Sequence, residues 1–81
     1  MEYSTLNNLK INEKAKLYRL DTSPDLKKRL MDMGLVAGTE ITKLFASADN
    51  GISAYLSRDT VVSLRREDAE KIITAPYRVM L

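Results

Sequence analysis

Two pairs of carboxylates are the side chains whose types and spacing first suggest chemistry in this chain. Asp21 and Asp25 stand four residues apart, and Glu67 and Asp68 are neighbours. Paired carboxylates can act as general acid and base when a cleft shifts their pKa values. The surrounding sequence indicates no such cleft, and acids are common in the first turn of a helix. We therefore interpret both pairs as surface acids and expect no enzymatic activity.

The composition argues against several other kinds of site. The chain has 81 residues with no cysteine and no histidine. Nucleophilic catalysis usually needs an activating base such as histidine, and Fe(II) and Zn(II) sites usually use histidine or cysteine ligands. Only carboxylates, carbonyls and thioethers remain. The sequence therefore predicts no catalytic residue, no metal ligand, no cofactor and no disulfide.

The three glycines do not form a phosphate-binding loop. Gly34, Gly38 and Gly51 are scattered, and no Lys-Ser or Lys-Thr pair follows a glycine-rich run. We expect these glycines at structural turns and predict no small-molecule substrate.

Two basic clusters raise the question of nucleic-acid binding. They are Lys27-Lys28-Arg29 and Arg65-Arg66, in a chain whose net charge is only +2. That charge is too small to indicate nucleic acid, and basic residues on a helix more often form a solvated face. A small β-barrel that stacks RNA bases on Tyr3, Tyr18 and Tyr55 remains an alternative, although nucleic acid is not the favoured partner.

The strongest local signal predicts a helix over Pro24–Met33. Ser23 is a favourable N-cap, and Pro24 suits the first helical position, where its missing N–H costs nothing. Gly34 follows the last turn and can end the helix with a positive φ angle. An apolar stripe at i, i+4 and i+7 is expected to face the core: Leu26, Leu30 and Met33.

Apolar and β-branched residues around this helix predict five short strands. They are residues 15–20, 40–46, 52–56, 61–64 and 72–73. Asn50-Gly51 is typical of a hairpin turn, Gly38 is a flexible point after the helix, and residues 66–70 suggest one helical turn. Pro76 should end the last strand, because it cannot donate to a ladder.

This arrangement predicts a mainly β protein, namely a small SH3-like five-stranded barrel with one helix between strands 1 and 2. Residues 1–81 are expected to form a single domain, with 76–81 as a tail that is flexible or pairs with a barrel edge. No apolar run is long enough to span a bilayer, and the first ten residues lack the order of a signal peptide. The cytoplasm is the expected compartment.

Three segments together resemble the FeoA family. Leu26–Thr39 is similar to the central family motif, in which a helix ends in Arg-Leu and leads into hydrophobic-Gly-hydrophobic and a second Gly. Leu6–Leu20 resembles the opening strand of the family. Val61–Ile72 resembles the closing strand, with its Leu-Arg and its Asp-Ala before an isoleucine. The segments follow in order and span nearly the whole chain.

The resemblance implies an accessory protein of the Feo ferrous-iron transport system. Its implied partner is FeoB, a membrane transporter with a cytoplasmic GTP-binding domain, which would recruit the chain to the inner face of the membrane. Transition metal ion binding then enters only through the transport system, since this chain lacks the usual ligands. The same domain also occurs fused to metal-dependent repressors, so a free-standing regulatory domain remains a further alternative.

A partner-binding surface is expected on the outer side of the helix. Met31 should point away from the apolar stripe, and an exposed methionine among charged residues is typical of an adaptable contact surface. The candidate contact residues are Lys27, Lys28, Met31, Asp32 and Leu35. The apolar residues Tyr77, Val79, Met80 and Leu81 offer a second candidate, for self-association.

Overall fold

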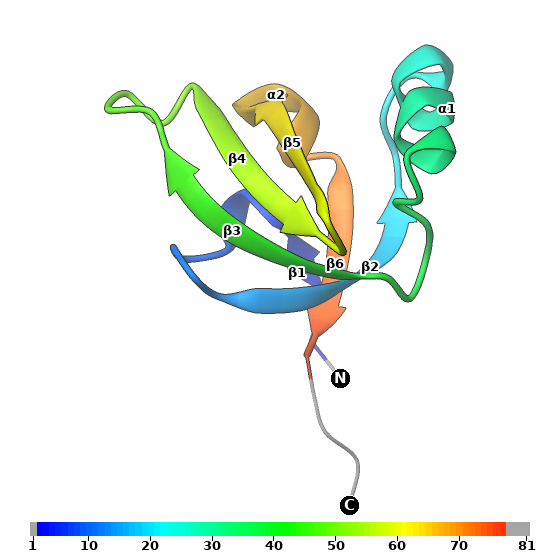
Figure 1. Cartoon of the computed structure of the whole chain (residues 1–81), viewed down its shortest axis with the longest axis horizontal. Coiled ribbons are helices and arrows are strands. Elements are labelled where there is room, and N and C mark those ends of the chain that lie inside the picture. Colours follow the sequence, from blue (N-terminus) through cyan, green and yellow to red (C-terminus); the bar gives the residue numbers. More distant parts are fainter. Residues whose placement is uncertain (1, 78–81) are drawn as a thin grey trace, which may run out of the picture.

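The computed structural model describes residues 2–77 and is built on one antiparallel sheet (Figure 1). The strand order is β1-β6-β2-β3-β4-β5. Three helical segments interrupt the strands, of which α1 is the longest. In chain order the elements are β1 (Ser4–Thr5), the 3-10 helix η1 (Leu6–Asn8), β2 (Lys14–Leu20), α1 (Pro24–Asp32), β3 (Glu40–Ala46), β4 (Ile52–Ser57), β5 (Thr60–Arg65), α2 (Arg66–Ala69) and β6 (Ile72–Pro76).

The predicted class is confirmed, but the predicted number of strands is wrong. The five predicted strands correspond to β2–β6, and α1 follows the first of them, as expected. The strand that was not predicted is β1, which has only two residues. It pairs with β6, where Ser4 lies opposite Thr74. A two-residue strand is too short to produce a detectable alternation. A pairing between β1 and β5 that would close a barrel is not found within residues 2–77.

The start of α1 follows the predicted capping. The Ser23 hydroxyl accepts a hydrogen bond from the Leu26 backbone N–H at 3.4 Å, and Pro24 occupies the first helical position. The N-cap therefore satisfies one of the free N–H groups of the first turn.

The end of α1 corrects two predictions about side-chain orientation. Gly34 adopts φ +93°, the Leu35 N–H donates to the Leu30 carbonyl at 2.9 Å, and the Gly34 N–H donates to the Met31 carbonyl at 2.9 Å. This Schellman motif usually brings the residue after the glycine against the last turn of the helix. Leu35 is accordingly buried, whereas Met33 is 42% exposed and does not belong to the inward stripe.

A single hydrophobic core is enclosed by the curved sheet, α1 and η1. Tyr55 on β4 and Ile41 on β3 are fully buried. Leu26 packs against the core from α1 and is only partly buried. The buried members are Leu6, Leu9, Ala15, Leu17, Leu20, Leu30, Leu35, Ile41, Tyr55, Val62, Leu64, Ala69 and Ile72.

The last strand is longer than predicted. β6 continues to Pro76, which is paired with Ala15 of β2. β6 lies between β1 and β2, but β1 reaches only as far as Thr74. Pro76 therefore has a neighbour on one side alone and does not need an N–H on the other side. Of the predicted tail, residues 78–81 lie outside the described part of the chain.

The connection between β3 and β4 turns at Asn50, as predicted. Asn50 has φ +60°, while positive φ among the glycines is found at Gly34 and Gly38 and not at Gly51. The Asp49 carboxylate accepts hydrogen bonds from the Ser47 hydroxyl at 2.7 Å and the Gly51 N–H at 2.9 Å. These bonds hold the pKa of Asp49 below its usual range.

Candidate partner-binding surface

A groove of about 190 Å³ lies between α1, β2 and the segment that follows α1. Met31 and Lys27 contribute one side of it from α1, and Tyr18 and Arg19 contribute the other from β2. Met31 and Tyr18 are each 46% exposed. The lining residues are Leu17, Tyr18, Arg19, Leu20, Lys27, Met31, Val36 and Ala37. An exposed apolar groove of this kind, edged by charged residues, is typical of a protein-binding site.

An irregularity of the sheet places Tyr18 in this groove. The pairing of β2 with β6 shifts register between Leu17 and Arg19, so that Tyr18 has no partner on β6. Such a bulge re-aims the side chain of the extra residue. The Tyr18 ring lies against the ring of Tyr3, with their centroids 4.3 Å apart. The bulge therefore adds an aromatic surface beside the groove.

Backbone hydrogen bonds fix the far wall of the groove to β2. The Gly38 N–H donates to the Leu17 carbonyl at 2.7 Å, and the Leu17 N–H donates to the Thr39 carbonyl at 2.8 Å. Gly38 has φ +90°, which lets the chain turn back onto the strand. This contact holds Val36 and Ala37 opposite α1.

Two cationic side chains, Arg19 and Lys27, border the groove, and only Arg19 is paired with a carboxylate. The Arg19 Nε lies 2.9 Å from the Asp21 carboxylate, and this hydrogen bond raises the pKa of Arg19. Its charge is therefore partly balanced. Within residues 2–77, Lys27 has no carboxylate close enough to form an ion pair. Lys27 is the cation most available to a partner.

The structure brings together only part of the predicted contact set. Met31 and Lys27 line the groove, whereas Lys28 and Asp32 are exposed on α1 and do not line it. The prediction for Leu35 is wrong, because this side chain is 1% exposed.

The sequence did not predict the lining residues that β2 and the segment after α1 contribute. These are Tyr18, Arg19, Val36 and Ala37. The sequence offers Tyr18 only as a candidate for base stacking, because neither the bulge in β2 nor the contact between β2 and the segment after α1 leaves a pattern in the sequence. Of the other two tyrosines in that hypothesis, Tyr3 is exposed and Tyr55 is fully buried.

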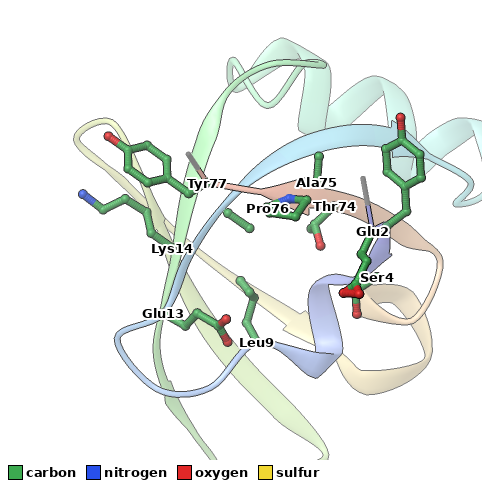
Figure 2. A pocket seen from close by; sticks show the side chains of 11 residues that line it. Glu2, Ser4, Leu9, Glu13, Lys14, Thr74, Ala75, Pro76 and Tyr77 are labelled. Carbon is green, nitrogen blue, oxygen red and sulfur yellow. The ribbon is translucent and has the colours of Figure 1, made fainter. Parts of the chain in front are cut away.

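A second hollow of about 390 Å³ lies where β1, β2 and β6 meet (Figure 2). Glu2, Glu13 and Lys14 are among its lining residues, and Figure 2 shows the two carboxylates at separate places around it. The Lys14 Nζ lies 5.3 Å from the centre of the Tyr77 ring. No group of three or more histidine, cysteine or carboxylate side chains suited to a metal occurs within residues 2–77.

The carboxylate pairs have the surroundings of surface acids. Asp21 is held by Arg19, Asp25 and Glu67 are exposed, and Asp68 is half-buried in α2. This arrangement offers no enclosed pair of carboxylates for acid–base catalysis.

A small antiparallel sheet with one exposed, groove-lining helix defines a small β module. Comparison with known proteins identifies which module it is. The model of the FeoA domain matches residues 4–76. The chain therefore belongs to the FeoA family, whose members are non-enzymatic transport accessory proteins.

Individual relatives agree with this assignment. An Fe(2+) transport protein A of Campylobacter jejuni is 32% identical over 69 residues, which cover 85% of this chain and 92% of that protein. The solution structure of FeoA from Chlorobium tepidum has a TM-score of 0.82 at 27% identity, covering 86% of this chain and 68% of that one. A manganese-dependent transcriptional repressor has a TM-score of 0.83 at 14% identity, over 95% of this chain and 38% of that one. The last likeness concerns the fold alone.

The helices of residues 2–77 are too short to cross a membrane.

Proposed function

We propose that this chain is a cytoplasmic accessory protein that binds a FeoB-type ferrous-iron transporter and modulates it. Membership of the FeoA family supports this role. The observation that carries the choice of surface is the groove in which Met31, Tyr18 and Val36 are exposed beside Lys27. Ferrous iron is the cargo of the transporter in this proposal and is not held by this chain.

The chemistry of the groove suggests what it contacts on the transporter. Exposed methionine and aromatic side chains adapt to apolar anchors. Lys27 would pair with a carboxylate next to such an anchor, and a rim charge of this kind mainly sets orientation and association rate. Any nucleotide chemistry would belong to the GTP-binding domain of the transporter.

The direct experiment is a titration of the purified chain against the cytoplasmic GTP-binding domain of its cognate FeoB-type transporter. The titration is done without nucleotide, with GDP and with a non-hydrolysable GTP analogue, at physiological salt. Saturable binding is the expected result, and a difference between nucleotide states would identify the recognised state. If the isolated domain does not bind, the full-length transporter in detergent is used, and failure there as well refutes the proposal.

An RNA-binding role is the second candidate, and one contact favours it. Tyr3 and Tyr18 lie against each other beside Arg19, and aromatic residues next to a cation can stack nucleic-acid bases. Binding driven by phosphates should weaken steeply with salt. A titration with single-stranded RNA at low and physiological salt therefore separates the two candidates.

A further inference from the structure

The strand β5 has one free edge, which the pairing pattern defines. β5 is the last strand of the sheet and is paired only with β4. The Ile52 carbonyl accepts from Ser47 on the β3 side, whereas the Gly51 carbonyl accepts from Arg66 on the β5 side. Because backbone groups alternate along an antiparallel pair, every second residue of β5 turns its N–H and C=O away from β4. These residues are Val61, Ser63 and Arg65.

Nothing in the described part of the chain covers this edge. Val61, Ser63 and Arg65 are all exposed. Arg65 is also the N-cap residue of α2, so its carbonyl oxygen accepts the first hydrogen bond of that helix. Within residues 2–77 the free groups of this edge are therefore the N–H and C=O of Val61 and Ser63 and the N–H of Arg65. An unpaired edge of this length is a template for another extended chain.

A groove of about 430 Å³ lies along the same edge. Ser63, Leu64 and Arg65 of β5 form one side of it, and the first two turns of α1 form the other. Figure 1 shows α1 standing apart from the strands β3–β5. The complete lining is Ser23, Asp25, Leu26, Arg29, Ser63, Leu64, Arg65 and Asp68.

The groove is lined mainly by polar side chains, and Leu26 supplies most of its apolar surface. Leu64 is buried in the core. Leu26 packs against the core and remains partly exposed. The lining carries acidic and basic side chains in equal number, so its formal charges favour neither an anionic nor a cationic ligand. The features that remain for recognition are the unpaired backbone N–H and C=O groups along β5.

We propose that this groove binds one extended peptide segment, which joins the sheet as a further strand beside β5. An extended backbone is the complement of the β5 edge, because it repeats N–H and C=O groups at the same spacing. The side chain of the segment that lies over Leu26 is therefore apolar. This proposal rests on the proposed function, and it assigns the segment to the transporter.

The wall that α1 forms opposite β5 favours binding of a single strand over binding of the edge of another sheet. Neighbouring strands lie about 4.8 Å apart, so a strand backed by its own sheet would need space for a second strand beyond the first. The first two turns of α1 occupy that side. A second copy of this chain pairing β5 with β5 is accordingly disfavoured.

Two variants of one residue test the proposal. Ser63→Pro removes an edge N–H that the β4–β5 ladder does not use, and proline is tolerated at such a position. Ser63→Ala keeps this N–H and is the matched control. Binding of each variant to the detergent-solubilised transporter is compared with binding of the wild type, after thermal melting has shown that each is folded. We expect Ser63→Pro to weaken binding about tenfold or more and Ser63→Ala to change it less than about twofold.

Amide hydrogen exchange of the wild-type chain gives a second readout that needs no variant. Binding of the transporter should slow exchange at Val61, Ser63 and Arg65. Equal binding by both variants, or unchanged exchange at these amides in the complex, overturns the strand-addition proposal and leaves the proposed function intact. Absence of any wild-type binding overturns the proposed function, and this assignment of the segment with it.

Discussion

The Nζ of Lys43 on β3 lies 3.2 Å from the backbone carbonyl oxygen of Asn7 in η1, 36 residues earlier in the chain. Lys43 is 8% exposed, so most of its aliphatic chain is covered. A lysine can contribute both by packing its methylene groups and by satisfying a backbone acceptor. The contact joins the short 3-10 helix after β1 to the middle of the sheet.

Replacing Lys43 by alanine should lower the free energy of unfolding by about 1–3 kcal/mol, because it removes the donor to Asn7 and the packed chain together. Chemical denaturation measures the change. Lys28→Ala, at an exposed position of α1, is the control and should leave the midpoint nearly unchanged. Equal stability of both variants would show that the contact with Asn7 contributes nothing.

Gly34→Ala should destabilise the protein by about 1–2 kcal/mol, because an L-residue is strained at positive φ. A Cβ at Gly34 would meet no atom within 4 Å, so backbone strain is the whole expected cost. In a domain of this size each kcal/mol shifts the melting temperature by about 4–8 °C. Gly34→Val should cost more, since a β-branched residue is a stronger outlier there. An unchanged melting temperature in both variants would contradict the Schellman motif.

Met31→Lys should weaken binding to the transporter about tenfold or more, because it places a charge in the apolar groove. Met33→Lys is the matched control, since Met33 is similarly exposed but does not line the groove. The titration described above, with both variants checked for wild-type melting, gives the comparison. Equal loss in the two variants would mean that the binding surface is not this groove.

Tyr55→Phe should stabilise the protein by about 1 kcal/mol, because a buried hydroxyl without a partner is costly. Tyr55 is fully buried, and within residues 2–77 its hydroxyl makes no hydrogen bond of good geometry, although the Ser53 side chain is near enough to oppose part of the rise in its pKa. Thermal denaturation of both proteins at neutral pH tests this expectation, and a destabilised phenylalanine variant would reveal a partner for the hydroxyl.

The same residue should make stability depend on alkaline pH. Burial raises the pKa of Tyr55 above that of an exposed tyrosine. Above about pH 10 the unfolded chain therefore releases this proton before the folded chain does, and the unfolded state becomes favoured as pH rises. Denaturation midpoints between pH 9 and about pH 11 should fall more steeply for the wild type than for Tyr55→Phe. Parallel decline of the two proteins would contradict the raised pKa.

The sequence predicts the helix α1 best, because the residues that begin and end it lie within one short stretch of the chain. Ser23, Pro24 and Gly34 are adjacent to the helix that they delimit, and their roles are confirmed. Helical periodicity predicts Met33 in the core, whereas the structure buries Leu35 and leaves Met33 exposed. The periodicity does not continue past Gly34, because a residue with positive φ ends the helix there.

The candidate site was less accessible to prediction, because contacts between distant segments create it. The bulge at Tyr18 depends on the register of β2 against β6, which joins residues more than 50 positions apart. The groove beside β5 depends on how α1 and β5 are placed in space. Neither relationship has a local pattern. The sequence therefore proposes Met31 and Lys27 as contact residues but does not predict Tyr18 and Val36, which line the same groove.

The hydrogen bonds between Leu17 and the segment at Gly38 and Thr39 use backbone atoms alone. In the groove that Met31 lines, the segment after α1 is thus held against β2 by main-chain atoms, while the side chains of Tyr18, Met31 and Val36 supply exposed surface. Under the proposed function, substitutions at these three exposed positions would change the binding surface and leave these backbone hydrogen bonds in place. Recognition and folding would in this sense be separable, because exposed side chains supply the first and backbone hydrogen bonds support the second.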